Sequence, residues 1–333
     1  MKNKQLLTIL LITLFLITAS FNMVLAENYE ISSEEGQVTV AAGSIGGGWF
    51  TTSTALFDLF SRNIDGLKYS IVPGGGVSNP TTLQREEAQI VVVYTTNIFS
   101  AYNGEEPYGE PIDEMRGIAR LGMADVVHNF VRASTGFDSF SQIADEKPAL
   151  KIDTGTRGLA GELAVKRMLE LHGISYDNIK EWGGSVIHSS YSEATDRLKD
   201  GHIDAFMNND LVGKPLWKEM AQSVNINILS QDEEVVKQMV EKYGYSRAVI
   251  PAGTYKGQDE DVLSTSQETA IAVHKDVSED LVYWMTKLMF EEKERLVSAF
   301  DAFKHLDIEK APTQNCPLHP GAARYYRERG IID

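Results

Sequence analysis

The chain has 333 residues, a length that suits about two globular domains, and its 43% hydrophobic content is ordinary for a folded protein. It carries 47 acidic against 31 basic side chains, for a formal charge of -16. This excess disfavours nucleic acid and anionic membrane surfaces as partners, because both repel an acidic protein. A bound anion would therefore need positive potential supplied by its own site.

Residues 1–26 have the pattern of a secretory signal peptide. Lys2 and Lys4 precede an apolar run over residues 6–17, and Ala26 ends a small-residue cleavage pattern. A retained membrane anchor is the alternative, but the apolar run is short for a membrane span. We expect cleavage before Glu27 and an exported protein, periplasmic or otherwise extracytoplasmic, that is soluble once the signal is removed.

The sequence lacks the patterns of common catalytic and metal sites. The single cysteine, Cys316, cannot form an internal disulfide, and we interpret it as a buried, inert thiol. The seven histidines form no metal-binding motif, and no Gly-x-Ser-x-Gly nucleophile turn is present. We expect no bound metal, no cofactor and no catalytic activity.

Short apolar strands alternate with amphipathic helices along the rest of the chain. Strands are predicted at residues 38–42, 69–72, 90–94, 129–132, 151–153, 203–207, 226–229 and 269–274, and helices at 50–62, 161–172, 192–199 and 278–294. This alternation predicts the α/β fold class. No low-complexity linker separates two domains, so the chain is expected to cross between them on ordered segments.

Three glycine-rich loops follow predicted strands, at residues 43–48, 74–79 and 154–158. The first lacks the spacing of a dinucleotide fingerprint and the lysine of a P-loop. A loop without side chains at a helix start exposes backbone N–H groups and positive helix-dipole potential, which suit a carboxylate. Any one of these loops alone is better explained as a tight turn. Three loops at the carboxyl ends of strands together predict an anion-binding cleft.

Arg157 lies in the third of these loops. Its guanidinium could bind a carboxylate through two parallel hydrogen bonds. An exposed arginine at a helix start is the alternative, and the sequence leaves both open.

Five motifs in chain order resemble those of the TAXI family of TRAP-transporter solute-binding proteins. They are GSIGGGW from Gly43, GGVSN from Gly75, DGHIDAF from Asp200, PAGTYKGQ from Pro251 and PLHPGA from Pro317. Together they span nearly all of the chain after the signal peptide. The resemblance implies a type II periplasmic-binding-protein fold, in which two α/β lobes are joined by two hinge-strand crossings with the ligand cleft between them.

This fold predicts how the chain is divided. We expect the first lobe at residues 27–128 plus 275–333 and the second lobe at residues 129–274. We also expect Asn129–Arg132 and Thr269–His274 to be adjacent strands that cross between the lobes.

The resemblance also implies that both lobes contact the ligand. Hydroxyl and backbone N–H groups of the first lobe would hold a carboxylate, with Trp49 as an apolar wall. The predicted binding residues are Ser44, Gly46, Gly47, Trp49, Ser78, Asn79, Tyr94 and Thr95 in the first lobe, and Thr156, Arg157, Asn208 and Asn209 in the second.

The function implied is that of a receptor that closes on a small organic anion and delivers it to the membrane subunits of a TRAP transporter. The anion would be a glutamate-like amino acid or a C4 or C5 dicarboxylate such as 2-oxoglutarate. We expect the receptor to act as a monomer. Two alternatives stay open: a sensor that partners a membrane signalling kinase, and an exported enzyme in which Arg157 would steady an anionic transition state and His128 or His188 would act as the base.

Overall fold

A computed structural model of the protein describes residues 29–31, 36–312 and 315–333. The predicted signal peptide, residues 1–26, lies outside the described residues. Within the described part of the chain, no helix is long and apolar enough to cross a membrane.

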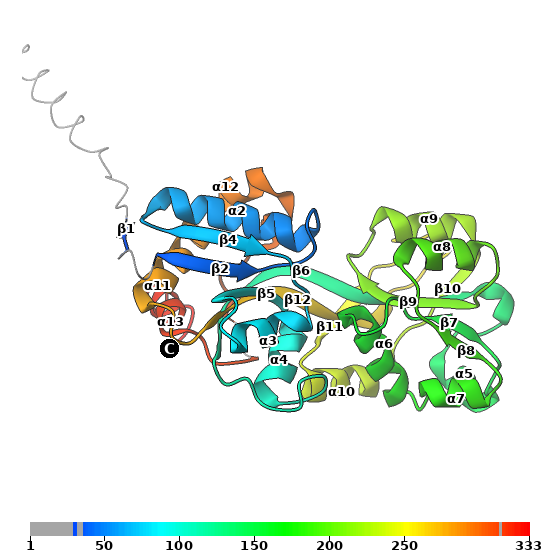
Figure 1. Ribbon diagram of the computed structural model, residues 1–333. Coiled ribbons are helices and arrows are strands. Elements are labelled where there is room, and N and C mark those ends of the chain that lie inside the picture. The colour runs from blue at the N-terminus through cyan, green and yellow to red at the C-terminus, as the bar shows by residue number, and fades with distance from the viewer. Residues whose placement is uncertain (1–28, 32–35, 313–314) are drawn as a thin grey trace, which may run out of the picture.

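A ten-stranded mixed sheet runs through the whole molecule (Figure 1). Its main path has the order β4-β2-β5-β12-β6-β9-β7-β8, with β10 beside β6 and β11 beside β12. The strands are β2 (Gln37–Ala41), β4 (Lys68–Val72), β5 (Ile90–Tyr94), β6 (Met115–Arg132), β7 (Lys151–Asp153), β8 (Ser185–Ile187), β9 (Ala205–Asp210), β10 (Ile226–Ile228), β11 (Ser246–Ile250) and β12 (Val262–His274). A separate small parallel pair joins β1 (Tyr29–Glu30) to β3 (Ile64–Asp65).

Helices cover both faces of this sheet, so the predicted α/β class is confirmed. The α-helices are α2 (Gly48–Asn63), α3 (Ser78–Gln84), α4 (Thr95–Asn103), α5 (Phe140–Glu146), α6 (Ala160–Leu171), α7 (Tyr176–Glu181), α8 (Tyr191–Lys199), α9 (Pro215–Ser223), α10 (Glu233–Tyr243), α11 (Glu279–Glu291), α12 (Lys293–Ala299) and α13 (Pro320–Glu328). Two 3-10 helices are η1 (Ala133–Thr135) and η2 (Asp301–His305).

Two long strands cross from one end of the molecule to the other. β6 has 18 residues and β12 has 13, whereas β2, β4 and β5 have five each. β6 and β12 pair antiparallel, from Ser266 opposite Val126 to His274 opposite Met115. The chain therefore passes twice through the same narrow region (Figure 1).

The apolar core is divided on either side of this crossing. Two buried clusters draw on residues up to 121 and on residues from 270 onward, and two others draw on residues 126–262. The predicted lobes, 27–128 with 275–333 and 129–274, stay a proposal. The divided core favours moving both limits earlier, to near Asp125 in β6 and near Gln267 in β12.

The expectation that Asn129–Arg132 and Thr269–His274 lie side by side is wrong. Asn129–Arg132 pairs with β9 and β10, whereas Thr269–His274 pairs with β5 and with the first half of β6. Each segment is one end of a longer strand, and the two strands run antiparallel. The two segments therefore lie toward opposite ends of the crossing.

Gly122 of β6 is packed directly against η2 of the C-terminal segment. It has a φ of +72°, and a Cβ atom at this position would lie 2.1 Å from the carbonyl oxygen of His305. No side chain fits that distance, so β6 and η2 can pack this closely only because residue 122 is glycine.

We expect Gly122→Ala to destabilise the protein far more than Gly109→Ala. Gly109 also has a positive φ, +77°, but a Cβ atom there would meet nothing within 4 Å. Gly109→Ala should therefore cost only the backbone strain, about 1 to 2 kcal/mol. Gly122→Ala should cost at least about 2 kcal/mol more, because η2 must move. Urea unfolding of both variants measures the difference in the free energy of unfolding. Equal decreases in the two variants would contradict the expectation and show that η2 moves away at no cost.

Candidate ligand-binding site

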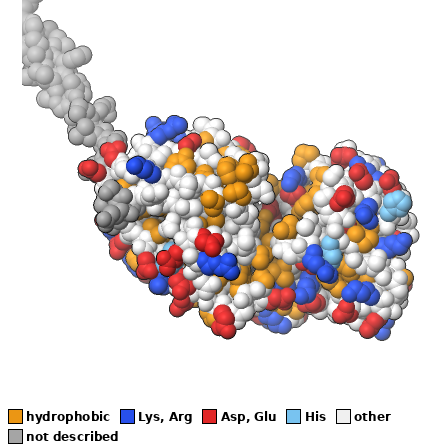
Figure 2. Space-filling view, in the orientation of Figure 1, with side chains coloured by type: hydrophobic (Ala, Val, Ile, Leu, Met, Phe, Trp, Pro, Cys, Tyr) orange, Lys and Arg blue, Asp and Glu red, His pale blue; other side chains and the backbone are white. Residues whose placement is uncertain are grey.

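The carboxyl ends of four strands meet at the crossing. Tyr94 at the end of β5 is opposite Thr269, and Asp210 at the end of β9 is opposite Val126, so β5 and β9 point toward the middle of the crossing from opposite lobes. β2 runs parallel to β5, and β7 runs parallel to β9. Figure 2 shows that the surface is hollowed between the two lobes in this region.

In the first lobe, the buried side chain of Asn79 holds two of the predicted loops together. Its Oδ1 atom accepts from the backbone N–H of Gly75 at 2.9 Å. Its Nδ2 atom donates to the carbonyl oxygens of Ala42 at 2.8 Å and Val92 at 2.7 Å. Asn79 is fully buried and its amide is used within the lobe, so it organises the loops rather than facing the hollow.

Trp49, Tyr94 and Gly76 form a compact wall at the same edge. The rings of Trp49 and Tyr94 meet edge to face, with centroids 4.6 Å apart, and Trp49 Nε1 donates to Thr269 Oγ1 at 3.0 Å. A Cβ atom on Gly76 would lie 3.2 Å from Tyr94 and 3.4 Å from Trp49. The glycine thus lets the second loop approach both aromatic rings.

The two long helices that start at this edge have no side-chain cap. Neither α2 nor α4 has a capping side-chain hydrogen bond or an acidic residue in its first turn. Ser44 and Gly46, which lead into α2, are exposed. The N-terminus of α2 therefore offers backbone N–H groups and positive dipole potential beside the hollow.

In the second lobe, Asn208 has a role that matches that of Asn79. Its Nδ2 atom donates to the carbonyl oxygen of Thr154 at 2.9 Å, and its Oδ1 atom accepts from the hydroxyl of Tyr191 at 2.9 Å. Cβ atoms on Gly155 and Gly161 would each lie 1.9 Å from this side chain. Asn208 is buried, so it too positions a glycine-containing loop from behind.

The loop that Asn208 supports carries exposed residues. Thr156, Arg157 and Leu159 are exposed between β7 and α6. The helix starts of this lobe differ from those of the first lobe, since Glu162 accepts from the N–H of Gly158 at 3.2 Å and Glu193 completes a capping box at α8. In the second lobe, α6 and α8 therefore begin with carboxylates of their own.

Two aspartates lie where the lobes join. Tyr94 donates its hydroxyl to Asp125 Oδ2 at 2.5 Å, and Asp210 accepts from Lys214 Nζ at 2.8 Å and from Trp217 Nε1 at 3.2 Å. The pKa of Asp125 is raised to about 6: burial is the largest cause and the charge of Asp210 adds to it, while the hydrogen bond from Tyr94 and the charge of Lys214 lower it. Burial and the charge of Asp125 raise the pKa of Tyr94 well above its usual range.

The structure brings the predicted residues to one region but gives them different exposures. Ser44, Gly46, Ser78, Thr156 and Arg157 are exposed, Gly47, Trp49 and Tyr94 are half-buried, and Asn79, Thr95, Asn208 and Asn209 are buried. The Thr95 hydroxyl accepts from the N–H of Glu268 at 3.3 Å, which ties α4 to β12. The binding role of the set stays a prediction.

Sequence reasoning missed Asp125, Tyr191, Asp210 and Lys214. Asp210 could have been found, because it directly follows Asn209 at the end of a buried strand. Asp125 lies inside a long strand, where a lone acid carries no recognisable pattern. No group of three or more potential metal ligands was found in the described parts of the chain.

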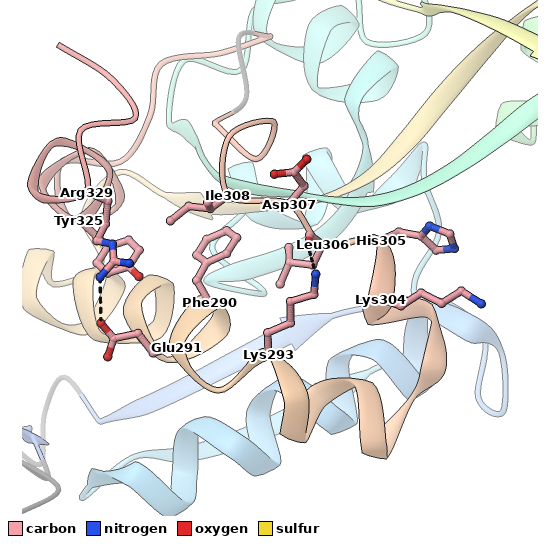
Figure 3. Close-up of a pocket in the computed structure, with 10 residues that line it drawn as sticks. All are labelled: Phe290, Glu291, Lys293, Lys304, His305, Leu306, Asp307, Ile308, Tyr325 and Arg329. Atoms are coloured by element: carbon pink, nitrogen blue, oxygen red, sulfur yellow. Dashed lines mark hydrogen bonds and ion pairs between the residues drawn. The ribbon is translucent and has the colours of Figure 1, made fainter. Parts of the chain in front are cut away.

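Another pocket, of about 450 Å³, lies on the first lobe among α11, α12, η2 and α13 (Figure 3). It contains none of the predicted binding residues. Two of its cations are already engaged, because Lys293 donates to the carbonyl oxygen of Leu306 at 2.6 Å and Arg329 lies 4.0 Å from Glu291. The crossing region remains the better candidate for a ligand site.

Three solved structures share this architecture. PhnD1 from Prochlorococcus marinus in complex with methylphosphonate aligns with a TM-score of 0.51 and 11% identity, over 90% of this chain and 100% of that one. A TctC solute-binding protein from Polaromonas gives a TM-score of 0.50 and 14% identity, over 89% and 96% of the two chains. XAC2383 from Xanthomonas citri bound to ATP gives 0.50 and 12%, over 89% and 97%.

The fold is therefore that of the two-lobed periplasmic solute-binding proteins, and the predicted fold class is confirmed. Residues 40–330 match the NMT1-like family. The chain therefore belongs to the NMT1-like family.

We expect Asp125→Asn to stabilise the protein at high pH and not at low pH. The folded state holds the pKa of Asp125 near 6, above its unfolded value near 4, so the ionised form is disfavoured by folding. Stability from this group is therefore lost as pH rises from about 4 through about 6. Asparagine keeps an acceptor for Tyr94 without the charge. Because Asp125 is only half-buried, the gain at pH 8 should be about 1 to 2 kcal/mol.

Thermal unfolding of both proteins at pH 4.5 and pH 8 measures this effect. The Tm difference should be clear at pH 8 and small at pH 4.5. A difference that is the same at both pH values, or a less stable variant at pH 8, would contradict a costly, half-buried carboxylate at the crossing.

Proposed function

We propose that the protein is the extracytoplasmic receptor of a TRAP-type transporter, of the TAXI family, and that it binds a small carboxylate between its lobes by hinge closure. It is proposed to act as a monomer, to catalyse no reaction and to deliver its ligand to the membrane subunits. The ligand class is a glutamate-like amino acid or a C4 or C5 dicarboxylate.

The observation that carries the proposal is the difference between the helix starts of the two lobes. α2 and α4 begin beside the hollow with no capping side chain and no acidic residue in the first turn. α6 and α8 carry Glu162 and Glu193 in their first turns. A carboxylate is stabilised by free N–H groups at a helix N-terminus, so the first lobe is the side that suits an anion.

The remaining contacts are proposed to come from both lobes. Trp49 and Tyr94 would pack against the carbon chain of the ligand, and Arg157 would approach a second carboxylate as the lobes close. A ligand that touches both lobes favours the closed state through contacts that the open state lacks.

Ligand-dependent stabilisation tests this function. We expect L-glutamate, 2-oxoglutarate or succinate at millimolar concentration to raise the Tm, because a ligand that binds only the folded state stabilises it by mass action. Methylphosphonate and L-arginine serve as comparison ligands. A rise with either comparison ligand alone would redirect the ligand class, and no rise with any of the five would contradict the proposal.

We expect Arg157→Ala to weaken binding of the carboxylate found in that experiment by roughly 30-fold or more. Arg157 is exposed, so the Tm without ligand should stay nearly unchanged. Arg157→Lys should restore part of the affinity, because lysine keeps the charge but loses the fork geometry. Calorimetric titration gives the three dissociation constants.

Arg85→Ala is the matched control, since Arg85 is exposed at the far end of α3 from the hollow. It should leave binding unchanged. If Arg157→Ala binds within a factor of about three of the parent, under about 1 kcal/mol, Arg157 is a surface residue and does not hold the ligand.

A further inference from the structure

The motif PAGTYKGQ, residues 251–258, has no place in the ligand site as described so far. It forms a tight loop after β11 that is fixed by Gln258. The Gln258 side chain donates to the carbonyl oxygens of Ile250, Pro251 and Glu260, each at 3.0 Å, and accepts from the N–H of Tyr255 at 3.3 Å. Gln258 and Tyr255 are both buried. The loop therefore holds Tyr255 in one place.

The Tyr255 hydroxyl lies between two partners. It accepts from the backbone N–H of Gly213 at 2.9 Å, so its own proton is directed to His128 Nε2, 2.7 Å away. His128 Nδ1 lies 2.8 Å from the carbonyl oxygen of Val126, to which it must donate. This arrangement requires a neutral His128, and burial lowers the pKa of His128 to about 4. The chain of hydrogen bonds has one direction, from Gly213 through Tyr255 and His128 to β6.

Gly213 belongs to the loop that joins β9 to α9. This loop begins at Asp210 and ends at Lys214, which are paired at 2.8 Å, and it carries the exposed side chains of Leu211 and Val212. Asp210 is paired with Val126 of β6, next to Asp125, which accepts from Tyr94 of the first lobe. The loop therefore starts at the crossing.

We propose that Tyr255 is a positioning residue for ligand binding, which fixes the loop of residues 211–214 against the crossing through its hydroxyl group. The inference rests on the proposed function for the location of the ligand. It goes beyond that function by giving the 251–258 motif a role in positioning. The buried Tyr255 hydroxyl, which donates to a neutral His128, fixes the loop of residues 211–214 on the second lobe.

Tyr255→Phe removes only the hydroxyl and keeps the ring packed against Phe130 and His128. Tyr326→Phe is the matched control, because the Tyr326 hydroxyl is equally buried and donates to the carbonyl oxygen of Ile118 at 3.0 Å in the first lobe. Tyr255→Phe loses the hydrogen bonds to Gly213 and His128, and Tyr326→Phe loses its one bond to Ile118. A merely structural role would lower the Tm of both and change nothing else.

We expect Tyr255→Phe to speed hydrogen exchange of the Gly213 amide by at least roughly tenfold, because this amide loses its partner. The dissociation constant for L-glutamate or 2-oxoglutarate should rise by roughly threefold to tenfold, as loss of the hydrogen bond from Gly213 implies. Tyr326→Phe should change neither. Calorimetry and hydrogen exchange with residue resolution measure both quantities. If Gly213 exchanges at the parent rate in Tyr255→Phe, or if exchange rises while affinity stays the same, the inference is overturned.

Two measurements on the parent protein complete the test. In the parent protein the Gly213 amide should exchange more slowly than that of Val212 in the same loop, and equal rates would overturn the inference even if Tyr255→Phe does not fold. If neither carboxylate binds the parent protein, the proposed function fails, and positioning for ligand binding fails with it. The Gly213 exchange rates still report whether Tyr255 holds the loop.

Discussion

Glycine-rich loops bring backbone N–H groups close to a ligand, but they have no side chains with which to hold their own shape. In this protein the shape comes from one buried asparagine in each lobe. Asn79 holds the loops after β2 and β4, and Asn208 holds the loop after β7. A buried amide bonded through both its nitrogen and its oxygen is costly to rearrange, because each lost partner leaves a polar atom without water. The geometry of the proposed site depends on these two side chains.

The crossing strands impose a second constraint, which is electrostatic. β6 brings the half-buried Asp125 beside the end of β9, where the buried Asp210 lies, and the charge of Asp210 contributes to the raised pKa of Asp125. Lys214 forms an ion pair with Asp210, and the hydroxyl of Tyr94 donates a hydrogen bond to Asp125. The lobes are thus connected by polar groups as well as by backbone pairing. Any hinge motion must keep or replace the Tyr94–Asp125 hydrogen bond.

The sequence predicted the fold class and most of the strands that carry the site, because short apolar runs followed by glycine leave few alternatives to a βα unit. It could not predict the extent of β6. Residues 115–124 carry arginines and glycines, such as Arg116 and Gly122, and the strand is specified there by its pairing with β12 and by η2 packed on Gly122. Long-range pairing of this kind leaves no local pattern.

The predicted site residues divide into exposed side chains in loops and buried side chains that support the loops. Side chains in glycine-rich loops, such as Ser44 and Arg157, are exposed as expected for groups that would meet a ligand. Asn79, Asn208 and Asn209 were predicted as ligand contacts from the family resemblance and from their place in a glycine-rich loop or at the end of a strand. The sequence cannot distinguish an amide that faces a ligand from one that supports a loop, because both need the same residue type at the same place in the fold.

Helix starts near the crossing differ between the lobes, and this difference assigns the lobes different parts in the proposed binding. In the first lobe α2 and α4 begin with no side-chain cap and no acidic residue in the first turn, whereas in the second lobe α6 and α8 carry Glu162 and Glu193 there. An anion would therefore be held first by the first lobe. The second lobe would add Arg157 and the loop of residues 211–214 only on closure. Because that loop is fixed through Tyr255 to His128 on β6, its position follows the crossing strand itself, so closure would move the loop as a rigid wall with the second lobe.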